Sequence, residues 1–150
     1  MSKEKEKVLF ICRNNSGRSQ LAEGLLRHLY GDHYQVWSAG LDPRPINPLT
    51  LEVLEELGVD TVTLESEGLE KFMDQEFDWV VLLCAGEGDE CPVSLSAAVF
   101  IQKVFPDPRD IPVEGDHTLE EKLQQFRVIR DQIQNWVKEQ FKPSPPPKKK

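Results

Sequence analysis

The fold of this chain is decided by one stretch near its N-terminus, Val8-Leu9-Phe10-Ile11-Cys12-Arg13-Asn14-Asn15-Ser16-Gly17-Arg18-Ser19. Its apolar beginning predicts a buried strand that ends at Cys12. Five residues then separate Cys12 from Arg18, and a helix is expected to follow from Ser19. This order places the backbone N–H groups of the loop and the positive end of the helix around one point.

Such a loop is typical of a site that binds a tetrahedral oxyanion. Arg18 can hold two oxygens through its planar guanidinium group. The same positive field favours the thiolate form of Cys12, which is the nucleophilic form of the side chain. The alternative is that Cys12 is an inert cysteine at a strand end, and the flanking strand and helix argue against it. The predicted oxyanion-binding residues are Arg13, Asn14, Asn15, Ser16, Gly17, Arg18 and Ser19.

Length and composition predict a single soluble domain. The chain has 150 residues, 39% of them hydrophobic, which suits one domain with one core. We expect a flexible leader over residues 1–6, a catalytic domain over 7–141 and a disordered proline- and lysine-rich tail over 142–150. No apolar run approaches the ~20 residues of a membrane span, and no signal peptide is recognisable. The expected location is therefore the cytoplasm, with no membrane partner.

Charge and cysteine content exclude several classes of function. The formal net charge is −8, which argues against a nucleic-acid partner because such binding needs a basic surface. An anionic substrate must therefore be attracted locally, at the loop, where Arg13 adds positive charge. The three cysteines and three histidines show no metal-ligand spacing, so no metal site is predicted. Three cysteines in a cytoplasmic chain indicate redox or nucleophilic chemistry rather than structural disulfides.

The alternation of strands and helices predicts an α/β fold. Strands are expected at residues 7–11, 35–38, 79–83 and 99–105, and helices at 19–30, 48–57 and 119–141. Residues 59–73 are less regular, with a short β-like piece at 59–64 and a weak helix at 69–73. The predicted architecture is a three-layer sandwich, with a central four-stranded parallel sheet and helices on both faces.

Ligands of such folds bind at the carboxyl ends of the strands, where Cys12, Cys84 and Asp107 all fall. Cys84 and Cys91 flank a loop with two glycines that could bring them together, and the less favoured alternative is that Cys84 is a core residue and Cys91 incidental. Asp107 lies between two prolines and is either a general acid or part of an ordinary turn. Asp110 is the competing acid.

These motifs resemble the thioredoxin-coupled arsenate reductases built on the low-molecular-weight tyrosine phosphatase fold. The similarity covers about residues 7–141, and its specific part is the arrangement of three cysteines. Phosphatases of this fold generally lack the Cys84/Cys91 pair and tend to carry tyrosine where this chain has Arg109. The resembling pieces are Val8–Ser19, Gln20–Gly24, Ser38–Gly40, Ile46–Pro48, Leu83-Cys84, Cys91-Pro92, Asp107-Pro108 and Phe126–Asp131.

The resemblance implies a disulfide cascade. Cys12 attacks arsenate held by the loop and Arg18, while Asp107 protonates the departing oxygen. Cys84 then attacks Cys12, arsenite leaves, and Cys91 moves the disulfide to the Cys84–Cys91 pair, which thioredoxin reduces. The resemblance implies no cofactor beyond these reducing equivalents, a monomer, and phosphate as a competing anion. Glutathione, mycothiol or a glutaredoxin could replace thioredoxin.

The sequence leaves two other functions open, and it departs from the family pattern in two places. The alternatives are a phosphatase that hydrolyses phosphomonoesters through a phosphorylated Cys12, and a non-catalytic anion sensor. Asn14 stands where members commonly have glycine, and asparagine tolerates a positive φ better than most residues. Residues 62–67 lack the family's Ser-x-His-x-Ser pattern, so no potassium site is predicted there.

Overall fold

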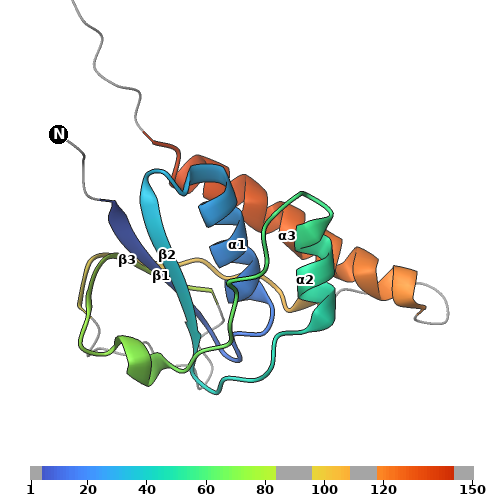
Figure 1. Ribbon diagram of the computed structural model, residues 1–150, viewed down its shortest axis with the longest axis horizontal. Coiled ribbons are helices and arrows are strands. Elements are labelled where there is room, and N and C mark those ends of the chain that lie inside the picture. The colour runs from blue at the N-terminus through green and yellow to red at the C-terminus, as the bar shows by residue number, and fades with distance from the viewer. Residues whose placement is uncertain (1–4, 84–95, 109–117, 144–150) are drawn as a thin grey trace, which may run out of the picture.

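The structure is a computed structural model that describes residues 5–83, 96–108 and 118–143 (Figure 1). Strands and helices alternate along most of this chain. The sheet is built from β1 (Glu6–Cys12), β2 (Tyr34–Gly40), β3 (Glu76–Leu82) and β4 (Ser96–Gln102). The helical elements are α1 (Arg18–Tyr30), α2 (Pro48–Glu55), the 3-10 helix η1 (Leu69–Phe72) and α3 (Leu119–Gln140).

The four strands form one parallel sheet in the order β2-β1-β3-β4. The first strand, β1, is therefore central, and its residues Val8–Ile11 are fully buried. Because all strands run the same way, the carboxyl ends of β1, β2 and β3 meet at one edge of the sheet. Cys12 pairs with Gly40 at this edge, and Ile11 pairs with Leu82.

Alternate residues of each strand supply two separate cores. The larger core lies between the sheet and the three α-helices α1, α2 and α3, which in Figure 1 lie on the same face. The smaller core covers the opposite face, where Phe72 of η1 packs with Phe77, Val80 and Leu82 of β3. The predicted α/β fold with a four-stranded parallel sheet is confirmed for the described part of the chain, where the three α-helices cover one face and the 3-10 helix η1 the other.

Two helices begin at local sequence signals, an asparagine before a proline and a threonine three residues before a glutamate. Asn47 caps α2, with Pro48 at its first position, and α3 begins with a capping box between Thr118 and Glu121. The side chain of Thr118 accepts a hydrogen bond from Glu121 N, while Glu121 Oε1 accepts one from Thr118 N. Each cap satisfies N–H groups that have no partner within the helix.

Three local predictions were wrong in detail. The last strand runs from Ser96 to Gln102 rather than over residues 99–105, because the apolar residues after it belong to a loop in which Phe105 is buried. The β-like piece predicted at 59–64 is a turn, in which Asp60 Oδ1 accepts the N–H of Val62. Val62 is apolar but 86% exposed, so its side chain does not contribute to a sheet face. The predicted helix at 69–73 is the 3-10 helix η1.

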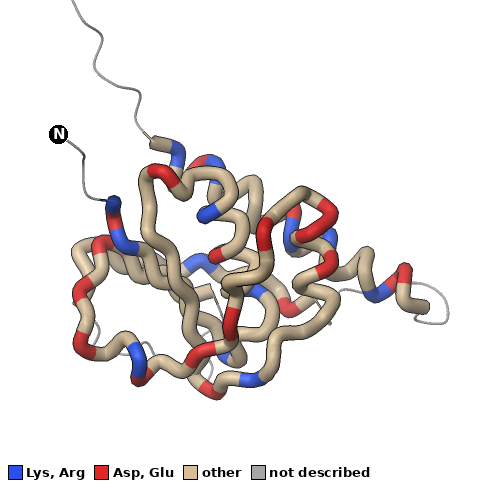
Figure 2. The backbone as a smooth tube through the Cα atoms, in the orientation of Figure 1, with Lys and Arg blue, Asp and Glu red and all other residues tan. Residues whose placement is uncertain are grey.

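Among the described residues, no helix is long and apolar enough to cross a membrane. Most of the predicted leader and tail, and the segment from Cys84 to Cys91, lie outside the described residues. Acidic residues outnumber basic ones, 26 to 18, and Figure 2 shows both kinds spread along the chain rather than gathered in one block.

Candidate active site

The loop between β1 and α1 turns its carbonyl groups away from its interior. Each carbonyl oxygen from Cys12 to Gly17 accepts a hydrogen bond from a donor outside the loop's interior. In a trans peptide the carbonyl and the next N–H point in opposite directions, so the N–H groups of residues 13–18 turn inward. The carbonyl oxygens of Cys12, Arg13 and Asn14 accept from Leu41 N (3.2 Å), Asp42 N (2.8 Å) and Arg44 N (2.9 Å) respectively. That of Asn15 accepts from Gln20 Nε2 (2.9 Å), and that of Ser16 from both Asn47 N (3.1 Å) and Thr50 Oγ1 (3.0 Å). That of Gly17 accepts from Leu21 N (2.9 Å).

Asn15 holds the loop in shape from its centre. Its side chain is fully buried, and its Nδ2 donates to the hydroxyls of Ser19 and Ser38 at 2.7 and 2.8 Å. Its Oδ1 accepts the N–H of Glu67 at 2.7 Å. Asn15, not Asn14, has the positive φ, at 50°, which asparagine tolerates in the left-handed region. Asn14, which stands where family members commonly have glycine, is not in the left-handed region.

Cys12, the predicted nucleophile, lies at the floor of the loop beside a serine. Cys12 is 2% exposed, and its Sγ lies 2.9 Å from the hydroxyl oxygen of Ser19. Because Ser19 already accepts a hydrogen bond from Asn15, its own proton is available to Cys12. The Ser19 hydroxyl and the inward N–H groups therefore surround the sulfur with polar groups.

The hydrogen-bond chain that runs from Asn15 through Ser38 ends at the buried carboxylate of Glu23. The hydroxyl of Ser38 donates to Glu23 Oε1 at 2.5 Å, and Arg27 forms an ion pair with the other oxygen. Glu23 is only 6% exposed, and this burial raises its pKa, while the hydrogen bond from Ser38 and the charge of Arg27 oppose the rise. The network ties α1 to β2 directly behind the loop.

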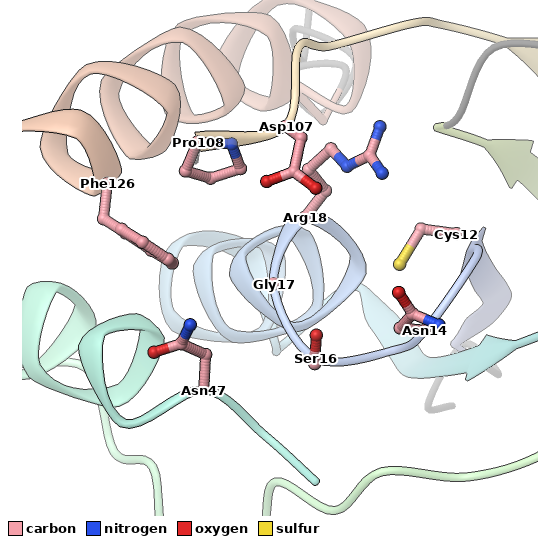
Figure 3. A pocket seen from close by; sticks show the side chains of 9 residues that line it. All are labelled: Cys12, Asn14, Ser16, Gly17, Arg18, Asn47, Asp107, Pro108 and Phe126. Carbon is pink, nitrogen blue, oxygen red and sulfur yellow. The ribbon is translucent and has the colours of Figure 1, made fainter. Parts of the chain in front are cut away.

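One pocket opens over the loop, and three predicted residues meet in it. Figure 3 shows Cys12, Arg18 and Asp107 around the same space, with the Asp107 carboxylate pointing into it from the segment after β4. Arg18 Nη1 donates to the carbonyl oxygen of Phe105 at 3.1 Å, which ties the arginine to that segment. Of the other predicted loop residues, Asn14, Ser16 and Gly17 also line the pocket. The remaining three do not line the pocket: Arg13 is exposed, whereas Asn15 and Ser19 are buried.

Three further predicted residues, Cys84, Cys91 and Asp110, lie outside the described residues. The backbone leads directly to the first of them. Leu83 N donates to the carbonyl oxygen of Ile11 at 2.8 Å, so the residue that precedes Cys84 is bonded to the residue that precedes Cys12.

The pocket also contains residues that sequence reasoning did not assign to it, namely Asn47, Pro108 and Phe126. Asn47 carried a helix-capping signal, but nothing local to it pointed to the loop. A second missed residue is Gly40, whose missing Cβ would lie 2.9 Å from backbone atoms of Asn14 and Asn15. Only glycine allows β2 to approach the loop this closely. Among the described residues, no three or more His, Cys, Asp or Glu side chains gather as they would around a metal ion.

Comparison with known proteins places this geometry in context. A sequence profile of the low molecular weight phosphotyrosine protein phosphatases matches residues 7–142. An arsenate reductase of Halalkalibacterium halodurans is 34% identical over 134 residues, which cover 89% of this chain and 94% of the relative. A solved arsenate reductase in the phosphate-binding state superposes with a TM-score of 0.74 at 31% identity, covering 89% of this chain and 95% of that one. A thioredoxin-dependent arsenate reductase of Corynebacterium glutamicum superposes with a TM-score of 0.64 at 27% identity, covering 95% of this chain and 63% of that one.

Proposed function

We propose that this chain, which belongs to the low molecular weight phosphotyrosine protein phosphatase family, is an arsenate reductase. The observation that carries the proposal is the position of Cys12. It is buried at the floor of the loop, and the residue before it, Ile11, accepts a backbone hydrogen bond from Leu83. The next residue in the sequence after Leu83 is Cys84, which would supply the second thiol. The relatives named as arsenate reductases, matched over about nine-tenths of the chain, support the same activity.

The first step uses the groups around the pocket. The Cys12 thiolate attacks the arsenic of arsenate bound by the inward N–H groups and by Arg18. A sulfur–arsenic bond forms, and an oxygen leaves as water after Asp107 gives it a proton. Arg18 and the loop stabilise the negative charge throughout this exchange.

The later steps reduce arsenic and oxidise the thiols. The Cys84 thiolate attacks Cys12 Sγ, the sulfur–arsenic bond breaks, and its electron pair stays on arsenic, which leaves as arsenite. The two thiols have become a Cys12–Cys84 disulfide. Cys91 then attacks Cys84 and expels the Cys12 thiolate, and a thioredoxin reduces the resulting Cys84–Cys91 disulfide with two electrons.

This cycle needs no bound cofactor, because thiols and then thioredoxin supply both electrons. We propose that the protein acts as a monomer and in the cytoplasm, where a reducing environment returns its three cysteines to thiols. Inorganic phosphate should compete with arsenate, because the two anions share charge and tetrahedral shape.

The test is arsenate-dependent NADPH oxidation in the presence of thioredoxin and thioredoxin reductase. The wild-type protein should turn over continuously. Cys91→Ser should release about one arsenite per protein and stop at the Cys12–Cys84 disulfide, whereas Cys84→Ser should release none. Hydrolysis of para-nitrophenyl phosphate in the same preparation serves as the comparison. If hydrolysis requires Cys12 and arsenate is not reduced, the protein is a phosphatase and the proposal is wrong.

A further inference from the structure

Asn47 joins the anion-binding loop to the first turn of α2. Its backbone N–H donates to the carbonyl oxygen of Ser16 at 3.1 Å, and its own carbonyl oxygen accepts the N–H of Thr50 at 2.9 Å. The residue is thus held by its backbone on both sides, next to the point where the loop turns into Gly17 and Arg18. Its side chain lines the pocket that contains Cys12 and Asp107.

The orientation of the Asn47 amide is set by the helix cap. Its Oδ1 accepts the N–H of Leu49 at 2.9 Å, and this N–H has no acceptor within the helix. Because the oxygen is needed there, the NH2 group must lie on the other side of the amide carbon. Figure 3 shows that side facing the pocket, with the oxygen turned toward α2.

We propose that Asn47 Nδ2 donates a hydrogen bond to an oxygen of the bound oxyanion that points away from the loop. This inference rests on the proposed function for its substrate, arsenate. The inward N–H groups hold the oxygens that enter the loop, and the outward side of the anion faces the pocket walls. Among the walls, Pro108 and Phe126 offer carbon atoms, whereas the Asn47 amide offers a donor.

This donor also makes Asn47 a specificity-determining residue. An inorganic oxyanion presents an oxygen to it, whereas a phosphate ester that places its carbon substituent there leaves the donor unpaired. Sites built around a donor discriminate against analogues that cannot accept its hydrogen bond. The amide is neutral, so it adds recognition without adding charge.

Two substitutions separate the donor from the cap. Asn47→Ser and Asn47→Asp both keep an oxygen that can cap α2, but neither keeps the amide NH2 group. Pro48→Ala is the matched control, because Pro48 begins the same helix, is exposed and does not line the pocket. The far-ultraviolet circular dichroism and thermal midpoint of all three variants should stay close to those of the wild type.

The readout is the dissociation constant of inorganic phosphate, measured as protection of Cys12 from iodoacetamide. Phosphate should bind about tenfold more weakly to Asn47→Ser, and more weakly still to Asn47→Asp, whose carboxylate repels the anion. Pro48→Ala should bind phosphate as the wild type does. Wild-type affinity in folded Asn47→Ser would overturn the inference. Weakened phosphate binding in a protein that fails to reduce arsenate would leave the role of Asn47 standing and refute only the proposed function.

Discussion

Arg18 Nη1 lies 3.1 Å from the carbonyl oxygen of Phe105, a residue 87 positions further along the chain. Phe105 is buried and is followed two residues later by Asp107. The hydrogen bond therefore links the residue proposed to bind the oxyanion to the segment that carries the proposed acid. The proposed binding and proton transfer share one support, and changes to Arg18 should affect both.

Arg18→Lys keeps the positive charge but loses the planar fork and the geometry of the bond to Phe105. We expect kcat/KM for arsenate to fall about 100-fold, as for the loss of an oxyanion-stabilising donor. The measurement is thioredoxin-coupled NADPH oxidation. Arg13→Lys, at an exposed residue that does not line the pocket, makes the same change of side chain and should alter kcat/KM by no more than about threefold. A wild-type kcat/KM in Arg18→Lys would show that only the charge of Arg18 matters.

Ser19→Ala removes the hydroxyl that lies 2.9 Å from Cys12 Sγ. Since a hydrogen bond to a charged group contributes about 1.5–3 kcal/mol, we expect iodoacetamide to alkylate Cys12 at least about tenfold more slowly at pH 7. Ser16→Ala is the control, because Ser16 supports the loop through its carbonyl oxygen, which accepts from Asn47 and Thr50. An unchanged alkylation rate in Ser19→Ala would mean that the hydroxyl does not assist the reaction of the sulfur.

Gly40→Ala would push a methyl group against the backbone of Asn14 and Asn15, 2.9 Å away. Because backbone cannot yield as a side chain does, we expect a loss of about 1–3 kcal/mol in the free energy of unfolding and a KM for arsenate raised at least about tenfold. Urea unfolding and coupled NADPH oxidation measure the two effects. In Gly24→Ala the new methyl group meets the flexible end of Leu54, so the KM should stay near that of the wild type. A normal KM in Gly40→Ala would show that the loop tolerates a shift of β2.

Glu56 connects α2 to α3 through ion pairs with Arg127 and Arg130, both at 2.7 Å. The hydrogen bond from Arg127 is the main reason that the pKa of Glu56 lies below its ordinary value of 4.5. A lowered folded-state pKa stabilises the protein above pH 4.5, and this contribution is lost as the pH falls through the folded-state value. Glu56→Gln should therefore lower the free energy of unfolding at pH 7, by no more than about 1 kcal/mol because solvent screens the pair.

The same comparison at pH 3 tests the sign. Urea unfolding should show that the difference between wild type and Glu56→Gln shrinks at pH 3, and that it also shrinks at pH 7 in 1 M salt, at which the Debye length is about 3 Å. Glu52→Gln, at an exposed position of the same helix, should behave as the wild type at both pH values. A difference that grew in acid would contradict the ion-pair account.

Much of the fold could be predicted because its signals are local. The apolar run before Cys12, the capping signals at Asn47 and Thr118, and the alternation of strands with helices all act over a few residues, and the structure bears them out. The last strand was misplaced by three residues because Phe105 is buried outside the sheet, and burial in a loop gives the same apolar pattern as burial in a strand.

The sequence by itself determined that Cys12 and Arg18 share one short loop, because only five residues separate the end of the strand from the start of the helix. Only the tertiary structure decided how that loop is held and what surrounds it. Its carbonyl groups turn outward largely because donors from the segment after β2 and from α2 reach them, and its outer wall includes Asn47 and Phe126. Those contacts depend on packing between segments that are distant in the sequence, which no local pattern records.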